Sequence, residues 1–360
     1  MKHALKGTGL IVAVMLSVSC NEIDDLLNHK SPANDPNVVN GVDTTVIRTD
    51  FPYQSKFVTV NGKRIHYVDE GQGEQTFLLV HGIPTSSYLW RNVIPHLQTQ
   101  GRVIALDLAG WGLSDKLAVE EMSWTSQTAY LEGFVDQLQL DRIIWVMHDL
   151  GGPLGLDIAR RNESKVAGLV FFDTQIAPIP SLDEVPPGEF RDFFVSISRG
   201  TPNNHRAGSG WDLIINQNFF PREQMNNMMR RTLSPAEIEA YAAPFPTPAS
   251  RRIIWETMRG VPVLGELDRI GQEDPERLAE NQANAQSLGA SLAWLQTTEL
   301  PKLAFYADPG LTFPEAIVPL LEGFPNTEVQ SAGESIHYYQ EDVPHRLGIA
   351  MAAWADTTSL

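Results

Sequence analysis

The stretch VMHDLGG, residues 146–152, decides the fold class of this chain. It continues the apolar run IIW at 143–145, which is typical of a strand buried on both faces of a sheet. Two glycines then open a stretch of helical character, so an acid stands at a sharp turn from strand to helix. This is the pattern of a nucleophile elbow, which normally presents a serine. We therefore expect Asp149 to be the nucleophile; the alternative is a carboxylate that only caps the helix.

Apolar runs of the same kind recur on both sides of this turn. A type I′ turn signal at Asn61-Gly62 predicts a β-hairpin between 57–60 and 64–68. Because strands that alternate with helices form parallel βαβ units, we expect an α/β-hydrolase fold with a doubly wound, mostly parallel sheet. The further elements that we expect are strands at 76–80, 103–106, 143–147, 167–172, 303–306 and about 327–331, and helices at about 87–98, 123–138, 151–162 and from 344.

The alternation of strands and helices stops between residues 178 and 295. This stretch is rich in Pro, Met, Phe and Arg, and its elements are expected to be short helices. A helical insertion between two strands of one parallel sheet predicts a cap over the active-site edge. The core is then expected to comprise residues 51–177 and 296–360, with the cap at 178–295, after the sixth strand.

The N-terminus has the pattern of a targeting segment. Two lysines precede an apolar run at 10–16, and small residues lead to Cys20, the only cysteine of the chain. The run is too short to span a bilayer, and the cysteine stands where a bacterial lipoprotein is cleaved and acylated. We expect a signal peptide at 1–20, a flexible tether at 21–50, and an exported protein anchored by a lipid on Cys20 to a bacterial membrane, facing the periplasm or the cell exterior.

The composition excludes several classes of partner. The chain has 360 residues and a net charge of −17, whereas nucleic-acid binding needs a basic surface. The same charge disfavours adhesion to an anionic membrane, so the N-terminal anchor is the only membrane contact that we expect. No cluster of ligand residues indicates a metal, and the chemistry outlined below needs no cofactor. The expected partner is an apolar small-molecule substrate.

The motif SIHY at 335–338 supplies the candidate general base. It follows the last predicted strand, which is where the catalytic histidine belongs in this fold class, and this position distinguishes His337 among nine histidines. The alternative is a surface-loop histidine. The acid that orients His337 is either Asp173, at the end of the sixth strand, or Asp308, after the seventh. We prefer Asp173, because Asp308 precedes Pro-Gly and is well explained as a turn former.

The motif HGIP at 81–84 follows the third strand. In this fold class the loop after that strand and the residue after the nucleophile each supply a backbone N–H to the oxyanion hole. We therefore expect the amides of Ile83 and Leu150 to form it.

Several motifs together resemble the haloalkane dehalogenase family, which includes a luciferase that oxidises coelenterazine. They are HGIPTSSYLWRN at 81–92, DLAGWGLSD at 107–115, the elbow at 148–149, residues 176–180, EAYAAPF at 239–245, DPG at 308–310 and HYYQED at 337–342. The resemblance covers about residues 55–355. In the subfamily that the chain most resembles, the acid follows the sixth strand, which favours Asp173, although that subfamily usually carries Glu there.

Two departures from the family concern the leaving group. The family binds the halide with a tryptophan directly after the nucleophile and an asparagine in the HGNP loop, where this chain has Leu150 and Ile83. Each lost hydrogen bond to a developing anion costs about 1.5–3 kcal/mol. Trp211 and Tyr241 of the cap are candidate replacement donors; the alternative is that both are core residues.

An aspartate nucleophile restricts the substrate. Attack on a saturated carbon leaves an alkyl ester, which a histidine-activated water can hydrolyse. The resemblance and this chemistry together predict a haloalkane-dehalogenase-like hydrolase acting on a halide or another activated carbon. An epoxide hydrolase or another α/β-hydrolase is the first alternative. A luciferase-like monooxygenase or a non-catalytic ligand-binding member is the second.

Overall fold

The computed structural model describes residues 47–185, 189–201 and 204–357. The expected signal peptide, Cys20 and most of the expected tether lie outside these residues. In the part of the chain that is described, no helix is long and apolar enough to cross a membrane.

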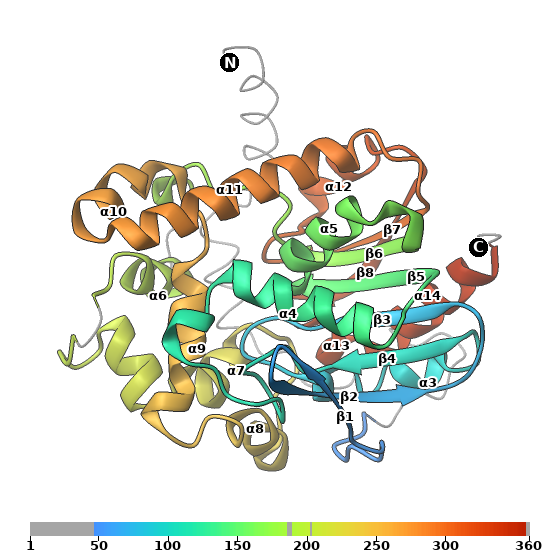
Figure 1. Ribbon diagram of the computed structural model, residues 1–360, viewed down its shortest axis with the longest axis horizontal. Coiled ribbons are helices and arrows are strands. Elements are labelled where there is room, and N and C mark those ends of the chain that lie inside the picture. Colours follow the sequence, from blue (N-terminus) through green and yellow to red (C-terminus); the bar gives the residue numbers. More distant parts are fainter. Residues whose placement is uncertain (1–46, 186–188, 202–203, 358–360) are drawn as a thin grey trace.

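One sheet of eight strands forms the centre of the molecule, in the order β1-β2-β4-β3-β5-β6-β7-β8 (Figure 1). The pairs β1–β2 and β2–β4 are antiparallel, and every later pair is parallel. The predicted α/β-hydrolase fold is thereby confirmed. The strands are β1 (Lys56–Val60), β2 (Lys63–Glu70), β3 (Thr76–Val80), β4 (Arg102–Leu106), β5 (Ile143–Asp149), β6 (Val166–Thr174), β7 (Lys302–Pro309) and β8 (Thr327–Ser335).

The predicted hairpin turn is confirmed, because Asn61 and Gly62 both have positive φ, at 49° and 80°. The predicted single helix over 87–98 is wrong. The chain forms a 3₁₀ turn, η2 (Ser87–Trp90), and then a separate short helix, α3 (Ile94–Leu97). A proline in the first turn of α3 explains the break, since proline starts a helix readily but cannot continue one.

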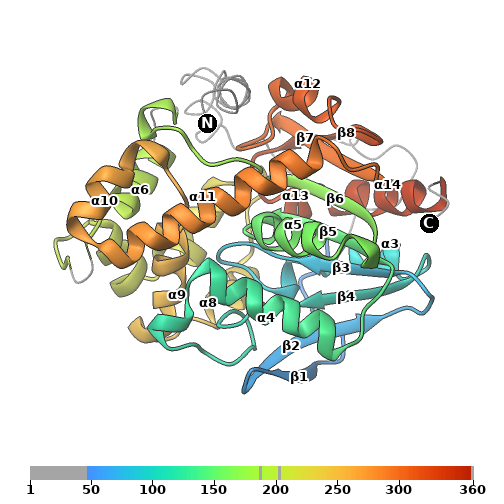
Figure 2. The ribbon, with the colours of Figure 1, turned by 45° about the horizontal axis from the view of Figure 1, so that its top comes forward.

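Helices cover both faces of the sheet (Figure 2). On one face α4 (Trp124–Gln137) packs beside α5 (Gly151–Arg161), and on the other α3 packs against the closing helix α14 (Pro344–Thr357). The short helices α12 (Val318–Leu321) and α13 (Tyr339–Asp342) complete the core. Because both faces are covered, β3 is buried along its whole length, as its continuous apolar sequence predicts.

A group of helices lies between β6 and β7 in the chain and at one end of the sheet (Figure 1). The prediction that these elements are short is wrong for α11, which has 21 residues. That helix starts beside α10 and continues along α5 and α4 of the core. The helices are α6 (Glu189–Ser198), α7 (Met225–Asn227), α8 (Pro235–Ala242), α9 (Pro248–Arg259), α10 (Leu267–Glu273) and α11 (Pro275–Leu295), with π-helical turns at Asp212–Asn216 and Phe220–Gln224. We refer to α6 to α10 and their connections as the cap.

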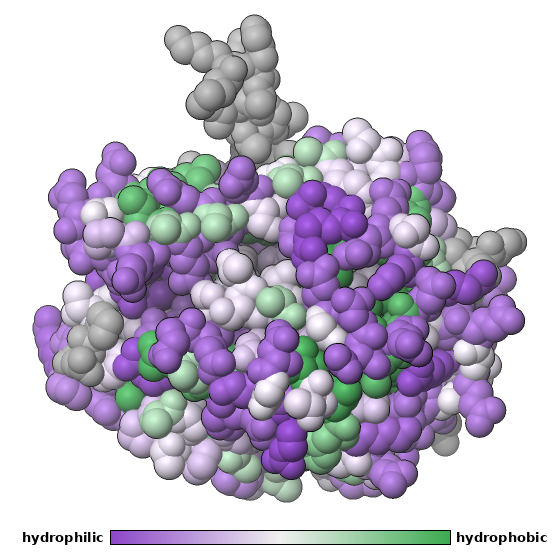
Figure 3. Space-filling model, viewed as in Figure 1, coloured by the Kyte–Doolittle hydropathy of each residue, from purple (hydrophilic) through white to green (hydrophobic). Residues whose placement is uncertain are grey.

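The surface seen in Figure 3 is mostly hydrophilic, with small hydrophobic areas scattered between charged and polar side chains. This pattern agrees with the charge of the chain, in which 44 acidic residues outnumber 27 Lys and Arg.

Candidate active site

The residue at the turn between β5 and α5 is Asp149, and its backbone is strained. Its φ is 50°, a left-handed conformation that is uncommon outside glycine and typical of a nucleophile elbow. The helix can start so close to the sheet only because glycines follow. A Cβ on Gly152 would lie 1.8 Å from Oγ1 of Thr174, and one on Gly151 would lie 2.3 Å from a backbone oxygen of β3. Thr174 also donates its hydroxyl to the Asp149 carbonyl at 2.6 Å.

The carboxylate of Asp149 contacts the loop after β3. The backbone N–H of Ile83 donates to Oδ1 of Asp149 at 2.7 Å. Gly82 permits this approach, since a Cβ there would lie 2.2 Å from the same oxygen. Leu150, the other predicted source of a backbone donor, is the N-cap residue of α5 directly behind the nucleophile. The structure thus brings the two predicted oxyanion-hole residues to the elbow.

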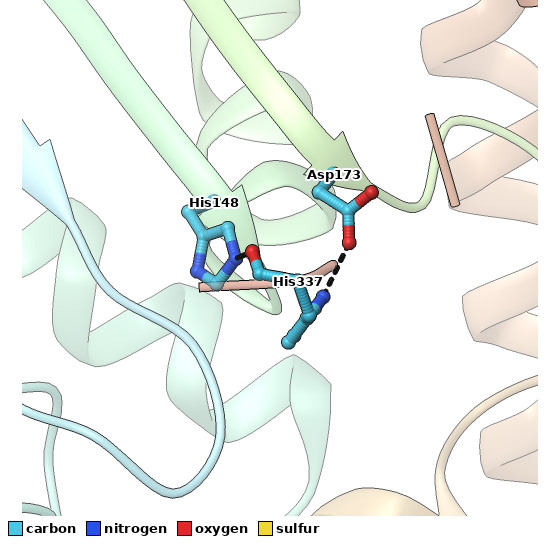
Figure 4. A group of neighbouring side chains, drawn as sticks. All are labelled: His148, Asp173 and His337. Atoms are coloured by element: carbon cyan, nitrogen blue, oxygen red, sulfur yellow. Dashed lines mark hydrogen bonds and ion pairs between the residues drawn. The ribbon is translucent and has the colours of Figure 1, made fainter. Parts of the chain in front are cut away.

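His337 lies between two carboxylates. Its Nε2 atom is 3.5 Å from Oδ2 of Asp149, and its Nδ1 atom donates to Oδ2 of Asp173 (Figure 4). Asp308, the alternative acid, has an exposed side chain on β7. The structure therefore joins Asp149, His337 and Asp173 and leaves Asp308 at the surface.

Asp173 is held firmly enough to orient a histidine. It is fully buried, and its Oδ1 atom accepts the backbone N–H groups of Thr312 and Phe313 at 2.9 Å each. The Tyr339 hydroxyl lies 3.1 Å from the same oxygen. With Oδ1 satisfied in this way, Oδ2 is left to accept from His337.

The two remaining histidines near the elbow have structural contacts. His148 Nε2 donates to the carbonyl oxygen of His337 at 2.9 Å (Figure 4). His81 Nδ1 donates to the Gly82 carbonyl at 2.8 Å, and its Nε2 accepts the backbone N–H of Leu108 at 3.0 Å. Both rings are therefore neutral donors that hold backbone segments beside Asp149.

The charges in the site keep the nucleophile ionised. Burial raises the pKa of Asp149, but its interaction with His337 outweighs this effect and lowers the pKa to about 2. Burial lowers the pKa of His337, whereas the contacts with Asp149 and Asp173 raise it to about 9. Burial lowers the pKa of His148 to about 3. The resting site therefore pairs a carboxylate with an imidazolium.

The nucleophile also faces open space. The side chain of Asp149 keeps 27% of its exposure, whereas that of His337 keeps 4% and that of Asp173 none. A substrate can therefore reach the carboxylate while the two residues behind it stay shielded from water. Shielding strengthens the interactions among the three.

The atoms of His148, Asp173 and His337 that could ligate a metal lie within 4.8 Å of one another. Each already has a hydrogen-bond partner: Asp173 binds His337, and His148 binds a carbonyl. A cation at this place would have to break the contact between the base and its acid. We therefore attribute the group to histidine orientation rather than to metal binding.

The two candidate leaving-group donors differ in their surroundings. Tyr241 donates its hydroxyl to Glu341 and is buried beside Arg91. Trp211 packs edge-on against Trp255, and its indole N–H is buried without a hydrogen-bond partner among the described residues. Tyr241 is therefore committed to a buried ion cluster, and the donor group of Trp211 remains available.

Sequence reasoning missed two tyrosines that follow the base. The Tyr338 hydroxyl donates to the Ile83 carbonyl at 2.9 Å, which ties the base's loop to the loop that holds Asp149. Tyr339 lies against Asp173, as described above. Their adjacency to His337 was the available signal, but no pattern in the sequence tells which way each side chain points.

Comparison with known proteins gives a consistent result. A family model described as alpha/beta hydrolase fold matches residues 75–199. The chain is 34% identical over 307 residues to a haloalkane dehalogenase of Sphingobium indicum, covering 84% of this chain and 95% of that protein. It is 35% identical over 311 residues to a haloalkane dehalogenase of Mycolicibacterium smegmatis, covering 84% and 91%.

Solved structures agree. An ancestral haloalkane dehalogenase superposes with a TM-score of 0.75 at 31% identity, covering 84% of this chain and 99% of the other. The haloalkane dehalogenase DatA from Agrobacterium tumefaciens C58 superposes with a TM-score of 0.73 at 29% identity, covering 85% and 97%.

Proposed function

Since this chain belongs to the haloalkane dehalogenase family of α/β-hydrolases and is a hydrolase, we propose that it hydrolyses an apolar small molecule at an activated carbon through a covalent alkyl-Asp149 intermediate. One observation carries the proposal. A carboxylate stands at the nucleophile elbow, open on one side to substrate, with a backbone N–H on one oxygen and a carboxylate-oriented histidine near the other.

The first step is a displacement at carbon. Oδ2 of Asp149 attacks the substrate carbon, a C–O bond forms, and the bond to the leaving group breaks with its electron pair. Oδ1 of Asp149 stays on the Ile83 amide, which fixes the direction of attack. The low pKa of Asp149 keeps the nucleophile ionised throughout the neutral range.

The second step hydrolyses the ester. His337 takes a proton from water, the hydroxide adds to the ester carbonyl, and the Ile83 and Leu150 amides stabilise the oxyanion. Collapse releases an alcohol and restores the Asp149 carboxylate. Alkylation removes the negative charge that helps to raise the pKa of His337, so the imidazole becomes a base when a base is needed.

The leaving group is the open part of the proposal. Ile83 and Leu150 offer no side-chain donor where the family's halide donors stand, and the Tyr241 hydroxyl is bound to Glu341. We propose a halide or a similarly activated carbon as the reacting group. Epoxide opening is the alternative, and it would require a different acidic proton.

Two assays separate these readings. Halide release from a panel of bromoalkanes should depend on Asp149 and be absent in Asp149→Asn. Turnover of epoxides without bromoalkanes would favour the epoxide hydrolase. No turnover, with ligand binding unchanged in Asp149→Asn, would favour a binding protein or a luciferase-like member.

The decisive experiment traps the intermediate. A His337→Phe variant, incubated with mixed bromoalkanes and epoxides, should accumulate an adduct on Asp149 that mass spectrometry locates and weighs. An unmodified Asp149 across the whole panel would contradict the covalent mechanism.

We also propose that the protein is exported and anchored by a lipid on Cys20. The support is the sequence alone, in which a short apolar run precedes the only cysteine. A Cys20→Ser variant should lose its membrane association in cell fractionation. A variant that still sediments with membranes would contradict the anchor.

A further inference from the structure

The loop that carries His337 is held by the cap. This loop, residues 335–342, lies against the cap segment 228–231, which connects α7 to α8. The Met228 carbonyl accepts the backbone N–H of His337 at 3.0 Å and that of Tyr338 at 3.4 Å. The backbone donors at the base are therefore satisfied by the cap.

A second contact comes from Asp342, at the far end of the same loop. Its Oδ1 atom accepts the backbone N–H of Arg230 at 2.8 Å and that of Arg231 at 3.0 Å. Its Oδ2 atom accepts the hydroxyl of Ser335 at 2.7 Å. One carboxylate thus joins both ends of the loop, which lie on either side of His337, to the cap segment.

The Arg231 side chain makes a third contact. Its Nε atom donates to the Glu341 carbonyl at 2.8 Å, and its guanidinium bonds the carboxylates of Glu341 and Glu237. Arg91 of the core, fully buried, bonds the same two carboxylates. Since a buried charge without its partner is costly, this cluster favours a single arrangement of loop and cap.

We propose that the cap segment 228–231 positions the general base, with Asp342 and Arg231 as the positioning residues. The inference rests on the role of His337 in the proposed function. Asp173 fixes only the Nδ1 end of the imidazole, and a ring held at one point can pivot about that bond. The cap contacts fix the backbone on both sides of the ring and so set where Nε2 lies relative to Asp149.

This arrangement affects the two chemical steps unequally. Alkylation uses Asp149, which core residues hold through the Ile83 amide and the Thr174 hydroxyl. Hydrolysis needs His337 in place. Loosening the cap contacts should therefore slow hydrolysis and spare alkylation, whereas general destabilisation would lower both in proportion to the folded fraction.

The test compares two substitutions of Asp342. Asp342→Ala removes the acceptor for all three donors. Asp342→Asn is the conservative rescue, since its Oδ1 can still accept both backbone N–H groups and its Nδ2 can donate to the Ser335 hydroxyl oxygen. Arg231→Ala removes the third contact, and Arg222→Ala, in an exposed cap ion pair with Glu239, is the matched control.

The first readout needs no substrate. Titration of the His337 ring protons by NMR should give a pKa of about 9 in the unmodified chain. In Asp342→Ala the pKa should fall towards the ordinary value, because the ring leaves Asp149, and Asp342→Asn should restore it.

The second readout is rapid-quench kinetics with a substrate that alkylates Asp149. We expect the hydrolysis rate constant of Asp342→Ala and Arg231→Ala to fall roughly 10- to 100-fold, the scale of a misplacement of about 1 Å, with alkylation little changed. Arg222→Ala should match the unmodified chain in both steps.

A folded Asp342→Ala that keeps both the His337 pKa and the ratio of hydrolysis to alkylation would overturn the inference, as would a failure of Asp342→Asn to restore them. If Asp342→Ala does not fold, Ser335→Ala removes one of the same hydrogen bonds and must show a smaller shift of the same kind. If no electrophile alkylates any variant, the proposed function fails, and the NMR titration still decides the positioning role.

Discussion

The Nε2 atom of His337 lies 3.5 Å from the Oδ2 atom of Asp149, so the base and the nucleophile of the proposed mechanism form an ion pair before any substrate is present. Each group stabilises the charged form of the other. This pairing links the protonation of the base to the state of the nucleophile, and the pH dependence of the two steps follows from it.

Alkylation should be independent of pH between about 4 and 8, because the pKa of Asp149 is about 2. Hydrolysis needs a neutral His337, so its rate constant should rise with pH. Its midpoint should lie below the pKa of about 9 that His337 has beside the charged nucleophile, since the ester carries no charge. Rapid-quench measurements from pH 5 to 9 check this. A hydrolysis midpoint at or above 9 would contradict the coupling.

The identity of the orienting acid can be tested with a matched pair. Asp173→Asn keeps the shape but loses the charge that stabilises the imidazolium, and turnover should fall about 10²–10⁴-fold, the scale of general acid–base catalysis. Asp308→Asn should leave turnover unchanged, since that side chain is exposed. Steady-state kinetics of both variants measures the effect, and the opposite ranking would assign the role to Asp308.

Adding leaving-group donors should increase dehalogenation. Leu150→Trp and Ile83→Asn each introduce a side-chain N–H at the positions where the resemblance places the family's halide donors. A hydrogen bond to a developing anion contributes about 1.5–3 kcal/mol, so each variant should raise kcat/KM for bromoalkanes by roughly 10- to 100-fold. Halide-release assays on the single and double variants test this. An unchanged rate in correctly folded variants would show that another group already binds the leaving group.

The buried ion cluster should contribute strongly to stability. Arg91→Met leaves the Glu341 and Glu237 carboxylates short of one cation, and we expect the free energy of unfolding to fall by about 3–5 kcal/mol. Arg222→Met, in the exposed pair with Glu239, should change it by less than about 1 kcal/mol. Urea denaturation of both variants gives the comparison, and equal effects would refute the special role of burial.

The sequence was sufficient where the signal is local. Apolar runs and glycines predicted the strands and the elbow, and chain order led from Asp149 to His337, because side-chain periodicity and turn chemistry depend on neighbouring residues. Local signals were misleading where a proline divides 87–98 into two elements, and where a helix of 21 residues was expected to be short.

What only the tertiary structure decided are contacts between distant segments. Asp173 meets His337 across 164 residues and receives amides from residues 139 and 140 positions away, while the alternation along β7 turns Asp308 outward. The commitment of Tyr241 to Glu341, 100 residues away, and the cap contacts around His337 are of the same kind. No local pattern encodes such distances, because they are set by how the sheet, its covering helices and the cap pack together. The sequence therefore determined which residues could do the chemistry, and the packing decided which of them meet.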